Sequence, residues 1–262
     1  MRLEDFYSLR DSNELPWPAC VAMSFVEETG STNDDLKKRI AQTHLHEPIG
    51  LTALIQTAGH GTRGRAWRSK AGGLYFSLAL PLESVSVGAT LIPLAVGEAL
   101  AGALRSKGVN VFLKWPNDLW IRSGKAGGIL CELLRDKGER RVLLIGVGIN
   151  LRGEDCLTTN GWPICGVDEE GRFDTPELRT ALLGKLVKGI FNSLLRDNES
   201  IIREWSSFDA FNNRKVAIEC ENERLIGRIL GIDANGRLLL RTDGKTQAFS
   251  SGSISPYDDS LD

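Results

Sequence analysis

The order of apolar and polar positions along the chain predicts strands and helices that alternate over most of its length. Short apolar runs bounded by turn residues are typical of strands. Seven such runs occur, at residues 21–27, 51–56, 73–80, 111–113, 119–122, 128–134 and 142–147. Their number and brevity indicate that a sheet forms the centre of this part of the protein.

Three segments carry the signals of a helix. In the first, Ser31 or Thr32 can cap the helix, and two aspartates that follow favour its first turn. The second is a long apolar stretch over residues 90–106 that ends at Gly108, a residue type common after helix C-termini. The third begins at Thr175, and leucine or isoleucine recurs there every four residues. The body is therefore expected to mix α and β elements.

The chain changes character after residue 211. Short apolar runs are separated there by Asn-Gly at 235–236 and Asp-Gly at 243–244, the pairs favoured in tight hairpins. Four or five short strands in about fifty residues, without helical periodicity, suggest a small barrel or sandwich. We therefore expect an irregular lead-in over residues 1–20, a body over 21–208 and a small β domain over 209–262.

Composition favours a soluble, cytoplasmic, globular protein with no membrane partner. The longest stretch without a charged side chain is too short to span a membrane, which takes about 20 apolar residues. The N-terminus lacks the apolar segment of a secretory signal. Lys and Arg number 32 against 34 acids, so the chain has no surplus positive field for nucleic acid. The five cysteines form no CxxC pair, which fits reduced thiols better than disulfides or structural zinc.

The acidic residues are absent over residues 48–82, although three arginines and a lysine lie close together there. The core of this segment, GHGTRGRAW over 59–67, offers glycine amides and arginines that can bind phosphate, and Trp67, whose ring could stack on a base. A solvated basic loop is the simpler alternative. The glycine spacing matches a dinucleotide fingerprint only formally, because a strand is expected after it where that fingerprint needs a helix. We expect an anion-binding loop between strands.

A second cluster lies over residues 113–134. Pro116 interrupts a strand-like stretch, and Asn117 and Asp118 follow it as polar groups between apolar runs. A turn and a ligand or metal role are about equally favoured by these residue types. Lys125 is expected in a loop directly before Ala-Gly-Gly, whose small side chains would let a ligand approach the backbone.

Five motifs can be compared with known families: GSTN at 30–33, QTAGHGTRGRAW at 56–67, KWPND at 114–118, KAGGIL at 125–130 and GVGIN at 146–150. In order and spacing they resemble the biotin protein ligase family. The tail, with GRILGIDANGRLLL and SSGSIS, is similar to the SH3-like C-terminal domain of that family. The resemblance implies an α+β fold, with a mixed-sheet catalytic domain of the biotin/lipoate ligase type followed by a small SH3-like β-barrel.

The resemblance also implies a two-step reaction. Biotin carboxylate attacks the α-phosphate of ATP to give biotinyl-adenylate and pyrophosphate, and a lysine of a biotin carboxyl carrier domain, such as that of acetyl-CoA carboxylase, then attacks the mixed anhydride. Carboxylate and phosphate repel each other, so cations, amide dipoles and Mg²⁺ are needed where charge develops.

The family's motifs imply roles for residues of this chain. The implied biotin contacts are Ser31, Thr32, Asn33, Gln56, Gly59, His60, Gly61, Thr62 and Lys125. The implied ATP and adenylate contacts are Arg63, Arg65, Trp67, Lys114, Asn117, Lys125 and Asn150, with Trp67 against the adenine. The implied catalytic residues are Lys125, Arg65 and Asp118; Lys125 would bridge the biotin carboxyl and the α-phosphate, and Asp118 is also the candidate metal ligand.

The chain departs from the common family pattern at Thr62, where an arginine is usual. A charge-assisted contact contributes about 1.5–3 kcal/mol. We therefore expect weaker retention of the adenylate unless Arg63 substitutes for the missing cation.

Two alternatives to a biotin protein ligase are compatible with the sequence. A lipoate or octanoate ligase or transferase shares the fold and also modifies lysines, although the basic loop and KWPND resemble the biotin branch. A non-catalytic biotin-binding module is the rival from another class, and Lys125 with its clustered cations disfavours it. Only about twenty residues precede the first expected strand, too few for a helix-turn-helix domain, so neither repressor activity nor DNA binding is expected. The sequence does not fix the oligomeric state, and a homodimer is compatible with it.

Overall fold

The computed structural model describes residues 18, 20–122, 124–158, 161–220, 223–255 and 257. The predicted lead-in over residues 1–20 therefore lies almost wholly outside the described residues. Among the described residues, no helix is both long enough and apolar enough to cross a membrane.

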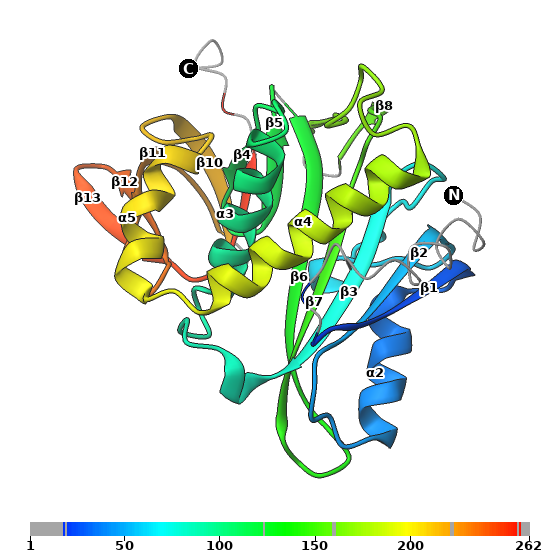
Figure 1. The fold of residues 1–262 in the computed structure, drawn as a ribbon. Coiled ribbons are helices and arrows are strands. Elements are labelled where there is room, and N and C mark those ends of the chain that lie inside the picture. The colour runs from blue at the N-terminus through cyan, green and yellow to red at the C-terminus, as the bar shows by residue number, and fades with distance from the viewer. Residues whose placement is uncertain are drawn as a thin grey trace.

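A mixed sheet of nine strands forms the body of the protein (Figure 1). Seven strands follow the order β1-β2-β3-β7-β6-β5-β4, and β9 joins β8 to β6. β1 and β2 are parallel, whereas the other neighbours along this order are antiparallel. The strands are β1 (Ala22–Thr29), β2 (Ile49–Gln56), β3 (Leu74–Pro81), β4 (Phe112–Lys114), β5 (Asp118–Ile121), β6 (Gly124–Arg135), β7 (Arg141–Ile149), β8 (Glu154–Leu157) and β9 (Pro163–Ile164). All seven predicted strands of the body are confirmed, and β8 and β9 are additional.

The three predicted helices are present, together with one that the sequence pattern did not indicate. They are α2 (Thr32–Gln42), α3 (Ile92–Arg105), α4 (Pro176–Leu194) and the additional α5 (Asn198–Phe208); two short 3₁₀ turns are η1 (Thr62–Gly64) and η2 (Leu82–Ser84). Ser31 caps α2 by accepting from the Asp34 amide, and Thr175 caps α4 in the same way. Helix α5 buries only Ser200, Ile201 and Trp205, which is too short an apolar pattern to recognise from sequence.

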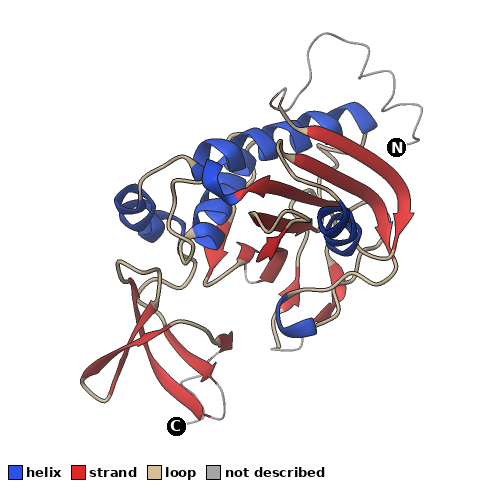
Figure 2. Cartoon of the chain, turned by 90° about the horizontal axis from the view of Figure 1, so that it is seen from below, coloured by secondary structure: helices blue, strands red, loops and turns tan. Residues whose placement is uncertain are grey.

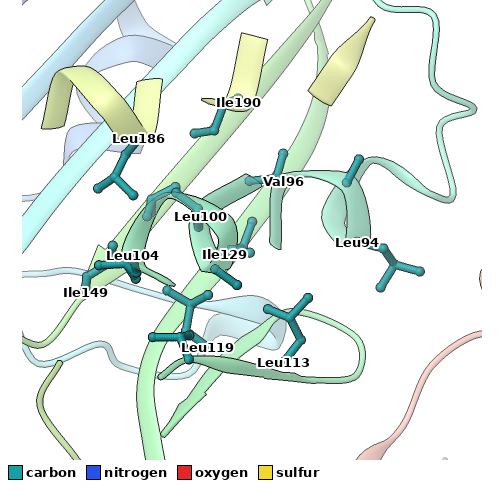
Figure 3. Close-up of a cluster of buried hydrophobic side chains, with 14 of the residues drawn as sticks. Leu94, Val96, Leu100, Leu104, Leu113, Leu119, Ile129, Ile149, Leu186 and Ile190 are labelled. Atoms are coloured by element: carbon teal, nitrogen blue, oxygen red, sulfur yellow. The ribbon is translucent and has the colours of Figure 1, made fainter. Parts of the chain in front are cut away.

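Helices cover both faces of the sheet (Figure 2). Alternate residues of β7 point to opposite faces: Leu144 packs with Leu36 and Ile40 of α2, whereas Ile145 belongs to the larger core beneath α3 and α4. Figure 3 shows that larger core, in which Leu100, Leu104 and Leu186 are fully buried between the helices and the strands.

The C-terminal residues form a separate antiparallel sheet of five strands in the order β13-β12-β11-β10-β14. These strands are β10 (Lys215–Cys220), β11 (Glu223–Ile232), β12 (Leu238–Thr242), β13 (Lys245–Phe249) and β14 (Ser253–Ser255). Two tryptophans of the body reach this sheet: the indole of Trp115 donates to the Gly236 carbonyl at 3.0 Å, and that of Trp162 donates to the Ile254 carbonyl at 3.0 Å.

The structure corrects the expected placement of Lys125, which lies in strand β6 and not in a loop. The glycines on either side of Lys125 are explained by the packing of neighbouring strands and not by a loop. A Cβ on Gly127 would lie 2.8 Å from the Gly148 carbonyl oxygen, and one on Gly124 would lie 2.5 Å from that of Pro163. Close approach of neighbouring strands therefore explains these glycines, and the strand continues through them.

Candidate active site

A pocket of about 680 Å³ lies on the face of the sheet that carries α2. Gly128, Gly146 and Gly148 of β6 and β7 line it. These three residues share one face of the sheet, because Gly128 is paired with Gly148, and Gly146 lies two positions before Gly148 in β7. The absence of side chains on this patch makes room for two side chains that pack on it: a Cβ on Gly146 would clash with the Asn33 side chain, and one on Gly148 would meet Trp67 at 2.6 Å.

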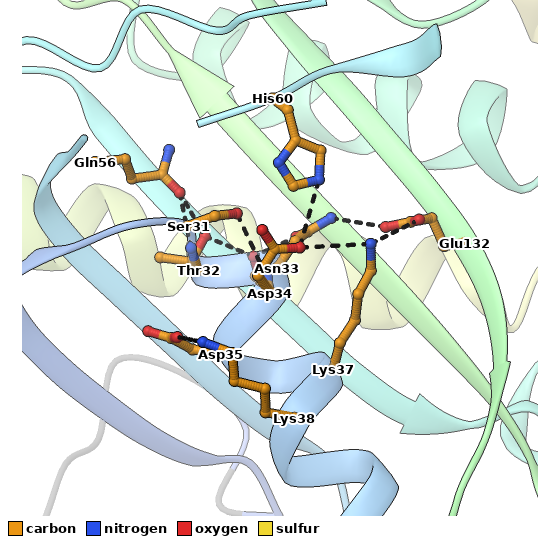
Figure 4. Close-up of polar contacts among 11 residues, drawn as sticks. Ser31, Thr32, Asn33, Asp34, Asp35, Lys37, Lys38, Gln56, His60 and Glu132 are labelled. Atoms are coloured by element: carbon orange, nitrogen blue, oxygen red, sulfur yellow. Dashed lines mark hydrogen bonds and ion pairs between the residues drawn. The ribbon is translucent and has the colours of Figure 1, made fainter. Parts of the chain in front are cut away.

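One end of the pocket is a buried cluster of hydroxyl and amide groups (Figure 4). The Thr32 hydroxyl donates to Gln56 Oε1 at 3.0 Å, and the Thr32 amide donates to the same oxygen at 2.9 Å. Ser77 of β3 lies beneath, with its hydroxyl 2.7 Å from that of Thr32 and 2.5 Å from Asn33 Oδ1. These groups are neutral hydrogen-bond donors and acceptors, and the hydrogen bonds among them hold their side chains in place.

A charged network supports this cluster from outside. Glu132 of β6 accepts from Asn33 Nδ2 at 3.2 Å and pairs with Lys37 at 2.9 Å. His60 Nε2 lies 3.6 Å from the Asp34 carboxylate, which joins the loop after β2 to the first turn of α2 (Figure 4).

A second centre of charge lies further along the pocket. Asp118 of β5 is between two ammonium groups, with Lys125 Nζ at 2.7 Å and Lys114 Nζ at 2.9 Å. Burial opposes ionisation of Asp118, but the two lysines outweigh it and lower its pKa to about 2. Lys114 is 5 % exposed, whereas the Lys125 side chain is 22 % exposed. Lys125 is therefore the member of this triad that a ligand can reach.

Trp67 lies flat over the glycine patch. A Cβ on Gly148 would lie 2.6 Å from the indole, and one on Gly128 would lie 3.3 Å from it. The ammonium of Lys125 is 5.2 Å from the ring centroid, within cation–π range. The indole nitrogen of Trp67 is buried and has no hydrogen-bond partner among the described residues.

The basic loop, which comprises residues 59–70, is held in shape by contacts among its own residues. Arg63 adopts a left-handed conformation with φ 60°. Arg65 donates to the Thr62 carbonyl at 3.4 Å and to the Thr62 hydroxyl at 3.2 Å. Thr62 therefore orients Arg65 with two oxygen atoms, at the position where the sequence resemblance led us to expect an arginine.

The structure brings most of the predicted site residues together in one pocket. Those that line it are Ser31, Thr32, Asn33, Gln56, His60, Gly61, Thr62, Arg63, Arg65, Trp67, Lys114, Asn117, Asp118, Lys125 and Asn150. Gly59 lies beneath the loop, where a Cβ would meet the Trp67 carbonyl at 2.9 Å. Asn117 follows a cis peptide at Pro116 and donates to the Ile129 carbonyl at 2.6 Å, so its amide nitrogen anchors the turn.

Sequence reasoning missed several pocket residues. Glu154, Cys156, Leu157, Thr158, Trp162 and Ile164 come from the region of β8 and β9, and Ser250, Ser251, Gly252 and Ser253 come from the C-terminal sheet. No local motif marks the positions from β8 and β9, and the SSGSIS run indicates only the C-terminal domain. Ser77 and Glu132 could have been found, because each is a polar residue within an otherwise apolar strand.

No group of three or more His, Cys, Asp or Glu side chains among the described residues could hold a metal ion. Asp118, the predicted ligand, has both carboxylate oxygens on lysines.

Comparisons with known proteins agree with this geometry. Residues 25–150 match the Biotin/lipoate A/B protein ligase family, and residues 213–256 match the Biotin protein ligase C terminal domain. The Escherichia coli bifunctional ligase/repressor BirA is 34% identical over 86% of this chain and 71% of its own length. A Mycobacterium tuberculosis biotin--[acetyl-CoA-carboxylase] ligase is 28% identical over 95% of this chain and 94% of its own length.

A solved structure shares the fold. The Aquifex aeolicus biotin protein ligase in complex with biotin and ATP aligns with a TM-score of 0.70 at 23% identity, over 89% of this chain and 97% of that protein. The matched motifs, the mixed sheet and the C-terminal sheet all agree with the sequence resemblance. The chain therefore belongs to the biotin protein ligase family.

Proposed function

We propose that this protein uses ATP to form biotinyl-adenylate and then transfers biotin to a lysine of a biotin carboxyl carrier domain. The observation that supports this most is the layout of the pocket. A neutral hydroxyl and amide cluster, a reachable lysine and an arginine-bearing loop line one pocket together with three glycines of β6 and β7.

The neutral end suits the ureido ring of biotin, which both donates and accepts hydrogen bonds. Thr32, Asn33 and Gln56 offer matching groups without a net charge. A lipoyl or octanoyl group has no polar ring to use them, and buried polar groups left without partners cost about 1–3 kcal/mol. This arrangement favours biotin over the acids used by the sister branch.

Lys125 has the position needed for the electrophilic role. Its ammonium can contact a carboxylate and a phosphate that meet above the glycines, and it stabilises the negative charge that develops there. The Asp118 carboxylate orients the Lys125 ammonium, and Lys114 helps to keep that carboxylate ionised. Arg65 and Arg63 are the cations available to the phosphates, and Trp67 and Trp162 are the aromatic surfaces available to the ligand.

Magnesium fits this site as an ion that arrives with the nucleotide. Mg²⁺ commonly keeps water and phosphate oxygens, and these would hold it here, because both carboxylate oxygens of Asp118, the predicted ligand, are paired with lysines. When bound, the ion neutralises the triphosphate and activates pyrophosphate as the leaving group.

The test is ATP–pyrophosphate exchange by purified protein, run with biotin, lipoate, octanoate and no acid. We expect exchange with biotin alone. Exchange with lipoate or octanoate would assign the protein to the sister branch, and no exchange with any acid would favour the non-catalytic binding module. Mass spectrometry of a carrier domain, intact and with its target lysine changed to arginine, then tests the transfer step.

We also propose that the chain acts without repressor activity, since its net charge of −2 provides no surplus positive field for DNA. A gel shift with the promoter of its own operon checks this, and sequence-specific binding would contradict it.

A further inference from the structure

One carboxylate connects two segments that line the pocket. Glu154 of β8 places Oε2 3.1 Å from Lys70 Nζ and 3.5 Å from an Arg68 guanidinium nitrogen. The two cations follow Trp67 in the loop between β2 and β3, far from Glu154 in sequence. The Glu154 side chain is 14% exposed, whereas both cationic side chains are 68% exposed.

The surroundings of Glu154 hold it in this position. Burial disfavours its charge, but hydrogen bonds from Lys70 and Cys156 and the charges of Lys70 and Arg68 keep the pKa of this carboxyl below its usual range. Tyr75 of β3 donates its hydroxyl to the Lys70 carbonyl at 2.8 Å, which fixes the backbone of the same loop. The carboxylate is thus charged, partly desolvated and aimed at the loop.

The connection matters because of what lies on either side of it. The loop carries Arg65 and Trp67, and the chain that continues from Glu154 carries pocket residues Cys156 and Leu157. Leu157 is 63% exposed and has little packing of its own to hold its strand in place. The ion pairs of Glu154 join this strand to the basic loop, together with a weaker contact of 3.9 Å from Arg68 Nη1 to Cys156 Sγ.

We propose that Glu154 is a positioning residue that fastens β8 to the basic loop, so that both walls of the pocket retain the bound adenylate together. The identity of that ligand rests on the proposed function. The described hydrogen bonds and ion pairs of the Glu154 side chain go to Arg68, Lys70 and Cys156 and none to Lys125, so its effect is on how long the ligand stays and not on the chemical step.

The test compares Glu154→Gln with wild type. Loss of two ion pairs to exposed cations should raise the KM for ATP and speed adenylate dissociation by about three- to tenfold, with kcat for exchange nearly unchanged. Glu139→Gln is the matched control, because it removes one carboxylate from the exposed pair with Arg135 away from the pocket. The charge-swapped variant Glu154→Lys with Lys70→Glu should restore slow dissociation in part, because it reverses the pair with Lys70 but places a second cation next to Arg68.

A second measurement does not depend on activity. Hydrogen exchange of the free protein should become faster in residues 65–70 and 154–157 of Glu154→Gln, and both segments should regain protection in the charge-swapped variant. The proposal would be overturned if hydrogen exchange in both segments were unchanged in Glu154→Gln. It would also be overturned if the charge-swapped variant restored neither slow adenylate dissociation nor protection from hydrogen exchange. Wild type could show no biotin-dependent turnover while hydrogen exchange in the variants changes as expected. The proposed function would then be wrong, whereas the role of Glu154 in joining β8 to the basic loop would be supported.

Discussion

Lys125 lies in strand β6 with its ammonium 2.7 Å from Asp118, so its replacement affects more than the chemistry. Lys125→Ala should lower biotin-dependent pyrophosphate exchange by at least about a hundredfold, because the developing charge loses its electrophile. It should also cost about 1–3 kcal/mol of stability, because Asp118 keeps only Lys114 as a partner. Exchange assays and thermal melts measure the two effects.

The expected loop position of Lys125 is wrong, because this residue lies in strand β6 and its ammonium is paired with Asp118. Lys38→Ala is a suitable control, because Lys38 is an exposed lysine paired with Asp35 on α2. Exchange at the wild-type rate in Lys125→Ala would remove this residue from the mechanism.

Thr62 is the residue at which the chain departs from the common family pattern, and the structure shows what it does instead. Its two oxygen atoms accept from Arg65. Thr62→Arg should slow adenylate dissociation by about tenfold, since it adds a charge-assisted contact. Thr62→Ser, which keeps the hydroxyl, should match wild type. Stopped-flow measurement of adenylate release checks this, and equal rates in Thr62→Arg and wild type would contradict it.

At the scale of elements, the glycines of β6 and β7 decide where the pocket can form. Gly148 has ordinary backbone geometry and could accept a methyl group, except that Trp67 occupies the space 2.6 Å away. Gly148→Ala should therefore displace the indole and weaken biotin binding by at least about tenfold while the strand remains folded.

Gly102→Ala is the control for that substitution. Gly102 lies in α3 with open space around its Cα, so alanine there should stabilise the helix by up to about 1 kcal/mol. Calorimetric titration with biotin measures both variants. Wild-type affinity in Gly148→Ala would show that Trp67 does not need the glycine floor.

At the scale of the whole molecule, α3, α4 and α5 meet around a buried charge. Glu98 of α3 is 3% exposed, and its burial, only partly offset by the Arg196 pair, raises its pKa to about 7. Because the folded state binds this proton more tightly than the unfolded chain, Glu98 destabilises the protein above pH 7. That penalty fades as the pH falls from about 7 towards the ordinary glutamate pKa.

Glu98→Gln should therefore raise the melting temperature at pH 8 by about 2–5 °C, and the gain should shrink at pH 5.5. Arg196 keeps its pair with Glu204 in this variant, so no cation is left alone. Calorimetric scans at both pH values test the sign, and a gain that grows towards acidic pH would contradict it.

The body and the C-terminal sheet contribute to one site. The indoles of Trp115 and Trp162 bind carbonyls of the C-terminal sheet, and the segment from Ser250 to Ser253 lines the pocket. The boundary expected between residues 208 and 209 stays a prediction. The contacts across it come from residues about 90 to 120 positions apart, which no local pattern could reveal.

The sequence by itself determined the elements and the motifs. Caps such as Ser31 and Thr175, and hairpin pairs such as Asn235-Gly236, act over a few residues, so their structure can be predicted locally. The motifs likewise indicated the family and most of the residues that line the pocket. Local signals failed at Lys125, where a run of glycines has the composition of a loop but forms a strand.

Only the tertiary structure decided how those residues work together. Asp118 lies between Lys114 and Lys125 because β4, β5 and β6 are paired in a particular register. Gly148 lies under Trp67 because β7 is paired with β6 so that this position faces the loop after β2. A one-residue slip in register would turn these side chains to the other face of the sheet. The chemistry of each residue is therefore encoded in the chain, whereas the geometry that combines them arises from long-range pairing.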